Sequence, residues 1–159
     1  IMTIDIVQYE VQVGPQDIDV LNHVNNRVYL RWVEEAATTA SAQNGWSTQD
    51  YLKLGAAWMA REHWIEYLRP CVLNDTIEIY TWIQSYQHGR SFRRYAMKNH
   101  GKLCCVAATE WVFVDLTVRR AIECPENVAS CFVTVPSDDA RLKELGIARC
   151  VRFAPVGLA

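Results

Sequence analysis

One short polar segment carries the side chains best suited to chemistry in this chain. Asp17 and Asp19 are followed by His23 and by the adjacent pair Asn25 and Asn26. Carboxylates and imidazoles act as general bases or nucleophiles, and free backbone N–H groups at a helix N-terminus stabilise an oxyanion. Acyl transfer requires these components. The same residue types are also ordinary capping and turn residues ahead of a helix, so this pattern alone favours capping.

The polar segment lies between a predicted strand and a predicted helix. Residues 7–13 alternate apolar and polar side chains, as half-buried strands do, and residues 26–43 change to helical spacing. Two adjacent rows of apolar residues follow the helix: Val28, Trp32, Ala36 and Ala40, and Tyr29, Val33 and Ala37. Asn25 or Asn26 can cap this helix, which places the polar segment at its N-terminus.

The remainder of the chain is predicted to be mostly strand. A short helix is expected over 48–54, strands over 58–68, 76–86, 91–98 and 103–115, a short extension over 120–124, and short helices over 125–131 and 137–145. A loose tail is expected after Gly146. The four strands are predicted to form an antiparallel meander that curls around the long helix. The prediction is a single α+β domain over residues 1–159.

The chain resembles the 4-hydroxybenzoyl-CoA thioesterase family in the pattern Asp-x-Asp-x-x-x-His-Val-Asn-Asn-x-x-Tyr-x-x-Trp-x-x-Glu, which begins at Asp17. It is also similar to the plant acyl-ACP thioesterases. Two further landmarks are similar: Glu66-Tyr-Leu-Arg-Pro with Asn74-Asp-Thr-Ile-Glu-Ile, and Gly89-Arg-Ser-Phe. The resemblance covers about residues 5 to 125. It implies a hot-dog fold, in which a curved antiparallel sheet of about five strands wraps a central helix. It also implies hydrolysis of acyl-CoA in a homodimer or homotetramer, with active sites at the subunit interface and no cofactor.

The resemblance also implies roles for individual residues. The catalytic carboxylate, acting as general base or nucleophile, falls on Asp19, with Asp17 as the runner-up. His23 and Glu35 match a histidine and a helical acid of the plant enzymes. The alternative without catalysis is that His23 orders the loop and that Glu35 is solvated or salt-bridged. Asn25 and Asn26 mark the helix N-terminus, where the oxyanion is expected.

The third landmark is expected to contact CoA. Arg90 and Ser91 match the family's basic residue and serine at the CoA phosphates, and charge-assisted hydrogen bonds suit such contacts. Strand alternation predicts that Arg93, rather than Arg94, shares a face with Ser91. The alternative is a solvated strand edge. His63 is predicted to be a packed or interface histidine.

Two positions depart from the family pattern. Asn22 stands where many members have Gly, and Asn tolerates left-handed backbone better than most residues. Val20 stands where the plant enzymes have Asn, which weakens the case for an ACP-linked substrate. The remaining rivals are a hot-dog hydratase or dehydratase and a non-catalytic acyl-CoA binding module.

Composition excludes several other classes. Sixteen basic and eighteen acidic residues give a formal charge of −2, whereas nucleic-acid binders carry a basic excess. No run approaches the roughly 20 apolar residues of a membrane span, and no signal-peptide core is present, so a cytoplasmic location is expected. The six cysteines form no CxxC pair and are expected to be reduced, with no metal site. Alternation predicts that Cys104 and Cys105 point to opposite faces of a strand.

Overall fold

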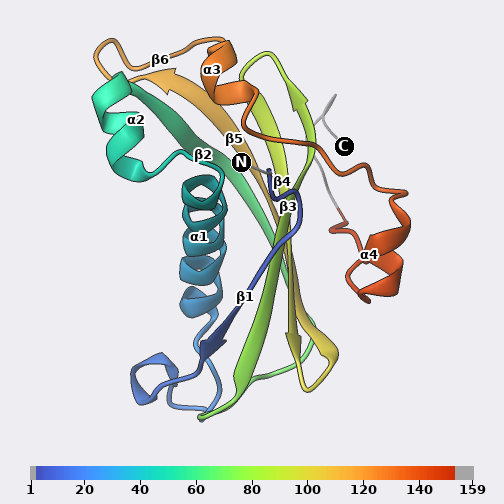
Figure 1. Cartoon of the computed structure of the whole chain (residues 1–159). Coiled ribbons are helices and arrows are strands. Elements are labelled where there is room, and N and C mark those ends of the chain that lie inside the picture. The colour runs from blue at the N-terminus through green and yellow to red at the C-terminus, as the bar shows by residue number, and fades with distance from the viewer. Residues whose placement is uncertain (1–2, 153–159) are drawn as a thin grey trace.

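One long helix lies against a curled antiparallel sheet in the computed structural model of the chain, which describes residues 3–152 (Figure 1). The elements are β1 (Val7–Gln12), the 3-10 turn η1 (Pro15–Asp17), α1 (Asn26–Gln43), α2 (Thr48–Leu54), β2 (Ala56–Tyr67), β3 (Thr76–Gln87), β4 (Arg90–Asn99), β5 (Lys102–Asp115), β6 (Arg120–Ala121), α3 (Glu126–Ala129) and α4 (Ala140–Glu144). The last two helices are shorter than predicted.

The sheet order is β1-β3-β4-β5-β2, and β6 pairs with β5. Every pairing is antiparallel, as predicted. The predicted four-strand meander is wrong, because only β3, β4 and β5 follow one another while β2 pairs with the far edge of β5. Residues 68–75 do not form a hairpin. They bind the β1–α1 loop instead, through hydrogen bonds from Val13 N to Asp75 O (2.9 Å) and from Val24 N to Cys71 O (2.9 Å).

The two hairpins of the sheet use the turns expected from the sequence. His88 and Gly89 join β3 to β4 with φ of 49° and 81°, and His100 and Gly101 join β4 to β5 with φ of 51° and 76°. Positive φ at both central residues matches the right-handed twist of the flanking strands. These turns therefore set the register of the central β3-β4-β5 meander.

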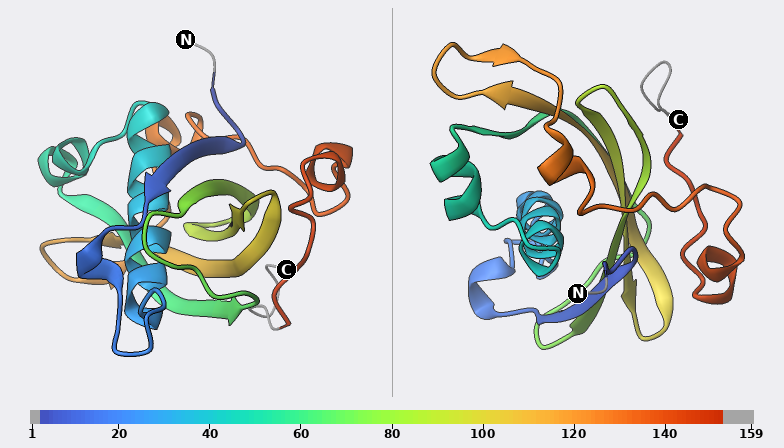
Figure 2. Two further views of the ribbon diagram at one scale, coloured as in Figure 1. Left: turned by 90° about the horizontal axis from the view of Figure 1, so that it is seen from below. Right: turned by 45° about the horizontal axis from the view of Figure 1, so that its top comes forward.

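The main core lies between α1 and the concave face of the sheet. All seven apolar residues of the two predicted helical rows are buried. They pack against strand residues that include Ile77, Ile79, Tyr95, Met97 and Ala107. The small side chains of Ala36 and Ala40 are fully buried, which lets the helix approach the curved sheet closely. The curl of the sheet around α1 is visible in Figure 2 and confirms the predicted hot-dog fold.

The convex face of the sheet is covered by α4 and the segments around it (Figure 2). Trp82 packs there with Leu142 and Ile147, which are all fully buried. The tail expected to be loose after Gly146 is therefore packed, and the Arg94 guanidinium donates a hydrogen bond to the Arg149 carbonyl (2.6 Å). Residues 153–159 lie outside the described part of the chain.

A β-bulge corrects one prediction about the cysteines. Met97 pairs with Cys105 and Lys98 pairs with Leu103, which leaves Cys104 as an extra residue in β5. Such a bulge interrupts the alternation of side chains. Cys104 and Cys105 are consequently both buried in the core beside α1, instead of facing opposite sides of the sheet.

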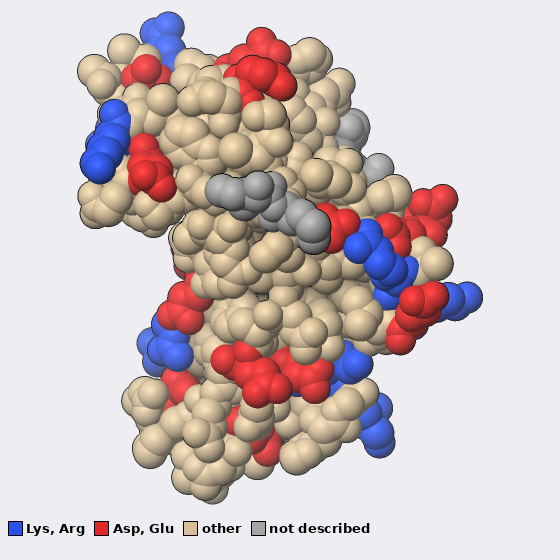
Figure 3. Space-filling model, viewed as in Figure 1, with Lys and Arg blue, Asp and Glu red and all other residues tan. Residues whose placement is uncertain are grey.

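The surface carries mixed charge. Basic and acidic side chains are interspersed on the face shown in Figure 3. Over residues 3–152, no helix combines the length and apolar character needed to cross a bilayer.

Candidate active site

The loop that precedes α1 forms a tight turn around Asp19. The Asp19 N–H donates to the His23 carbonyl (2.9 Å), and the Asn22 N–H donates to the Asp19 carbonyl (3.0 Å). The Leu21 N–H donates to Asp19 Oδ1 (2.8 Å). Asn22 has φ of 64°, so it adopts the left-handed backbone that its residue type tolerates. The turn therefore forms without the glycine that many family members have.

A cavity of about 370 Å³ lies between this turn and the start of α1. Its lining residues come from the turn, from the first turn of α1 and from the end of β2 with the segment after it: Asp19, Leu21, His23, Val24, Asn25, Asn26, Tyr29, Tyr67, Leu68, Arg69 and Pro70. Four predicted site residues, Asp19, His23, Asn25 and Asn26, are thus brought together. We call this the small cavity.

The N-terminus of α1 presents one unused backbone donor to the small cavity. Asn25 caps the helix, because its Oδ1 accepts from Arg27 N (3.0 Å). The carbonyl of Asn25 accepts from Val28 N (2.9 Å). Within residues 3–152, the backbone N–H of Asn26 has no such acceptor. A substrate oxygen can therefore accept that hydrogen bond where the helix dipole is positive.

The two acids of the loop have different environments. Asp17 is 2% exposed, and its carboxylate accepts from Gly14 N (2.9 Å) and from Arg31 Nη2 (2.9 Å). Asp19 is half-buried, and Leu21 N occupies only its Oδ1. Among the described residues, no donor reaches Asp19 Oδ2. Asp17 is thus committed to holding the loop against α1, while Asp19 keeps an oxygen available to the cavity.

Glu35 does not join the small cavity. Its side chain is 51% exposed, and its Oε1 lies 3.4 Å from Arg31 Nε. Arg31 in turn pairs with Asp17, so Glu35 belongs to the ion-pair network that supports the loop. This placement agrees with the alternative that Glu35 is a salt-bridged acid on a helix without a catalytic role. A catalytic role for Glu35 gains no support from its position.

Tyr67 and Arg69 line the small cavity, and sequence reasoning assigned them no role. The Tyr67 hydroxyl donates to the Asn26 carbonyl (3.2 Å), and its ring packs edge-to-face on Tyr29 with 5.3 Å between centroids. Burial raises the pKa of Tyr67, so its hydroxyl is a neutral donor. The landmark Glu66-Tyr-Leu-Arg-Pro contains both residues and is the signal that could have found them.

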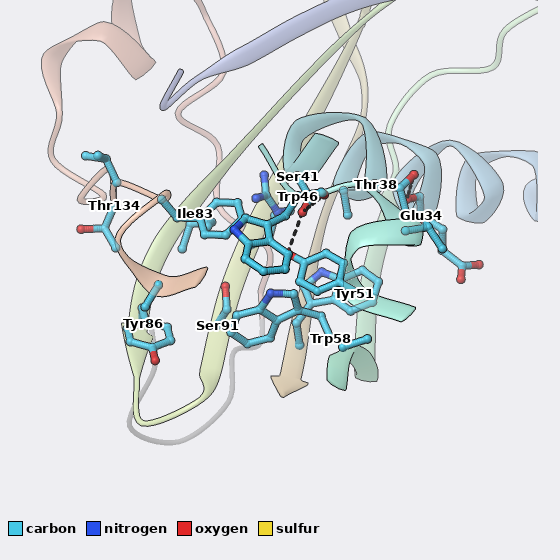
Figure 4. Close-up of a pocket in the computed structure, with 18 of the residues that line it drawn as sticks. Glu34, Thr38, Ser41, Trp46, Tyr51, Trp58, Ile83, Tyr86, Ser91 and Thr134 are labelled. Atoms are coloured by element: carbon cyan, nitrogen blue, oxygen red, sulfur yellow. Dashed lines mark hydrogen bonds between the residues drawn. The ribbon is translucent and has the colours of Figure 1, made fainter. Parts of the chain in front are cut away.

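A second cavity, of about 610 Å³, lies beside the later half of α1. It is enclosed by α2, by the concave face of the sheet and by residues 129–134. Trp46, Tyr51 and Trp58 gather within it, and the Ser41 hydroxyl lies 2.7 Å from the Tyr51 hydroxyl (Figure 4). Glu34 also lines this space, but its carboxylate points away from the aromatic rings. We call this the large cavity.

The predicted CoA-binding residues divide between the two faces of β4. Ser91 and Arg93 both line the large cavity, in line with the alternation expected for them. Arg90 points to the other face, where its Nε donates to the buried Glu110 carboxylate (2.7 Å). The three residues therefore do not form one anion site within a single chain, and CoA binding by them stays a prediction.

His63 is a packed side chain on β2. Its Nδ1 lies 2.7 Å from Thr109 Oγ1, and burial lowers the pKa of its imidazole. Its ring lies edge-on to that of Trp111. For the part of the chain that the structure describes, no group of three His, Cys, Asp or Glu side chains is arranged to hold a metal ion.

The chain is similar in sequence and in structure to known thioesterases. The model of the thioesterase-like superfamily matches residues 13–132. The chain is 28% identical over 118 residues to the long-chain acyl-CoA thioesterase FadM of Escherichia coli K12, covering 73% of this chain and 89% of that protein. Among solved structures, it resembles a DHNA-CoA thioesterase from Staphylococcus aureus (TM-score 0.76, 18% identity, 93% and 98% of the two chains). It also resembles the probable thioesterase YbaW from Escherichia coli (TM-score 0.70, 25% identity, 80% and 98% of the two chains).

Proposed function

The chain belongs to the thioesterase-like superfamily, and on this premise we propose that it hydrolyses acyl-CoA thioesters to a carboxylic acid and CoA. The observation that carries the proposal is the small cavity, which is lined by both Asp19 and Asn26. Within residues 3–152, Asp19 Oδ2 and the Asn26 N–H have no hydrogen-bond partner. The similarity to a protein named as a long-chain acyl-CoA thioesterase supports the substrate class.

The start of α1 is the proposed site of the thioester carbonyl. In this pose the carbonyl oxygen accepts a hydrogen bond from the Asn26 N–H, and the positive end of the helix dipole stabilises the charge that develops on it. Asn25 caps the next N–H of the helix, so it keeps the first turn in shape. The Tyr67 hydroxyl donates a hydrogen bond to the Asn26 carbonyl. These contacts fix the proposed oxyanion donor before substrate binds.

Asp19 is the proposed catalytic carboxylate. As a general base, it takes a proton from water, whose oxygen attacks the thioester carbon. As a nucleophile, it forms a mixed anhydride that water then cleaves. Both routes consume one water and release the acid and the CoA thiol. His23 holds the turn through its backbone carbonyl, and we assign its imidazole, which lines the same cavity, an assisting role in proton transfer.

Exposed guanidinium groups are the proposed ligands of the CoA phosphates. Arg90 is 37% exposed beside the β3–β4 turn, and Glu110 occupies its Nε, which leaves other donors for an anion. Arg69 is exposed at the small cavity itself. Ser91 and Arg93 are buried, and strongly hydrated phosphates are costly to bury, so these two suit the acyl group better than the phosphates.

A second copy of the chain is the proposed partner of β2. This twelve-residue strand pairs with β5 on one side, and no strand within residues 3–152 pairs with its other side. An uncovered strand edge is a template for pairing with another chain, and two-fold pairing is the commonest symmetry. Tyr67, the last residue of β2, and Leu68 after it line the small cavity, so a homodimer formed here brings the partner close to Asp19. Light scattering that gives the mass of a single 18.2 kDa chain would contradict this assembly.

The proposed reaction is tested by free-thiol release from a panel of acyl-CoAs. Wild type is expected to release thiol, and Asp19→Asn is expected to lose that activity while remaining folded. Consumption of an enoyl-CoA without thiol release would identify a hydratase instead. Tight binding of acyl-CoA without any turnover would identify a binding module.

A further inference from the structure

The large cavity contains one buried cation. Arg93 is 6% exposed, lies on β4 and contributes to the lining of this otherwise mostly aromatic and apolar space. A guanidinium stays charged at any physiological pH, and burial of an unpaired charge is unfavourable. The chain therefore keeps a positive charge at a position where an apolar residue of similar length would fill the same volume without that cost.

No group among residues 3–152 neutralises Arg93. Its Nη1 donates a hydrogen bond to Thr81 Oγ1 (3.1 Å). This is the only hydrogen bond between the guanidinium and residues 3–152. Over the same range, no carboxylate forms an ion pair with it. The nearby phenols supply no charge, because burial raises the pKa of Tyr51 to about 12 and also raises that of Tyr95. Remaining donors of Arg93 are left for a molecule inside the cavity.

We propose that the large cavity binds a carboxylate with an apolar body, and that Arg93 pairs with the carboxylate group. A guanidinium forms parallel hydrogen bonds with the two oxygens of a carboxylate, and this geometry is stronger and more selective than that of a lone ammonium. Trp46, Tyr51 and Trp58 enclose the apolar body of the ligand. The volume of about 610 Å³ falls in the range of pockets that hold small organic molecules.

The identity of the molecule that carries this carboxylate depends on the proposed thioester hydrolysis. Glu34 is the first residue of α1 that lines the large cavity, and Asn26 lines the small cavity. The two residues are eight positions apart, which is about 12 Å along the helix axis. One source is an acyl group that carries a second carboxylate at its far end, with its thioester at Asp19. The other source is the free acid itself, bound as product.

Binding of simple ligands to the purified protein tests the proposal without any turnover. Decanoate and decanamide are titrated separately, and the quenching of tryptophan fluorescence reports on a cavity lined by Trp46, Trp58 and Trp111. Wild type is expected to bind the acid about 10- to 100-fold more tightly than the amide, because hydrogen bonds to charged groups are strong. Equal affinities, or no binding of either ligand, would overturn the proposal.

Two variants connect the preference to Arg93. Arg93→Met is expected to abolish the preference for the acid and to keep binding of the amide. Arg94→Met is the matched control, because Arg94 is the next residue of β4, lies on the convex face over Trp82 and is not part of the cavity. A preference that survives in Arg93→Met would refute the assignment. If Arg93→Met fails to fold, the comparison of acid and amide in wild type still decides the matter.

Thiol release distinguishes the two sources. CoA monothioesters of α,ω-dicarboxylic acids are compared with those of monocarboxylic acids of equal chain length. A substrate with a distal carboxylate is indicated if wild type prefers the dicarboxylic series and Arg93→Met does not. Inhibition of turnover by free acids, without such a preference, indicates the product. If no thioester is hydrolysed, the proposed function fails, while the fluorescence titration still tests the cavity.

Discussion

Exchange of one oxygen for an amide nitrogen at Asp19 is the sharpest test of the proposed chemistry. Asp19→Asn keeps a side-chain oxygen that can accept the hydrogen bond from Leu21 N (2.8 Å), so the turn and its left-handed Asn22 are preserved. The variant loses the carboxylate that is proposed to activate water or to attack the thioester. General acid–base catalysis contributes about 10²- to 10⁴-fold, so kcat is expected to fall by that factor, or by about 3 to 5 kcal/mol in the barrier.

Asp17→Asn is the matched control, because it makes the same chemical change two residues earlier. Asp17 is 2% exposed and binds Gly14 N and the Arg31 guanidinium, so the loss falls on stability. Hydrogen bonds to a charged group contribute about 1.5 to 3 kcal/mol to the free energy of unfolding. Because the Arg31 side chain is half-exposed, solvent weakens its ion pair, and the loss in Asp17→Asn is expected near the low end of this range. For a chain of this size, a loss of 1 to 2 kcal/mol lowers Tm by roughly 2 to 8 °C.

The assays are thiol release at saturating acyl-CoA and thermal unfolding followed by circular dichroism. Asp19→Asn is expected to lose turnover at unchanged Tm, and Asp17→Asn is expected to lower Tm with most of its turnover retained. If the two variants exchange these phenotypes, then Asp17 carries the chemistry and the reasoning from their environments is wrong.

Three further changes have defined outcomes. Asn22→Val is expected to lower both turnover and Tm, by about 1 to 2 kcal/mol of strain at φ of 64°, whereas Asn22→Gly is expected to preserve both. Ala36→Leu overpacks the contact between α1 and the sheet, and a loss of about 1 to 3 kcal/mol is expected in chemical denaturation. Hydrogen bonds from Arg141 lower the pKa of Asp5 and of Asp139 below the usual range of an aspartate. Their contribution to stability is therefore complete above the unfolded-state pKa and is lost as the pH falls through the folded-state pKa values. Arg141→Met should therefore lose less Tm than wild type between pH 5 and about pH 3; an equal loss would contradict this pairing.

Local patterns predicted the helix and most strands well. The bounds of α1 follow from the spacing of its apolar rows and from Asn25 at its start, and both signals act within a few residues. The positive-φ turns at Gly89 and Gly101 likewise depend on adjacent residues. The order of the strands was not predictable in this way. The segment 68–75 pairs with a loop some fifty residues earlier, and no local pattern reports that contact.

The position of the candidate site was predictable from the sequence, but the residue types alone did not distinguish its two acids, and the choice of Asp19 came from the family resemblance. Asp17 and Asp19 are equivalent as residue types, and they differ because Arg31 reaches back from α1 to bury one of them. The large cavity had no sequence signal, because its walls come from α1, α2, the sheet and residues 129–134. Arg93 was expected to share a face with Ser91, but strand alternation does not reveal what that face encloses.

The position of both cavities along one helix affects how the protein can change over evolutionary time. Asn26 lines the small cavity and Ala37 lines the large one, about three helical turns further along α1. A substitution that enlarges Ala37 or Ser41 would shorten the proposed space for the acyl group, and neither residue belongs to the turn around Asp19. On the proposed function, descendants of such a chain could acquire new acyl preferences one mutation at a time while the proposed hydrolytic site is inherited unchanged.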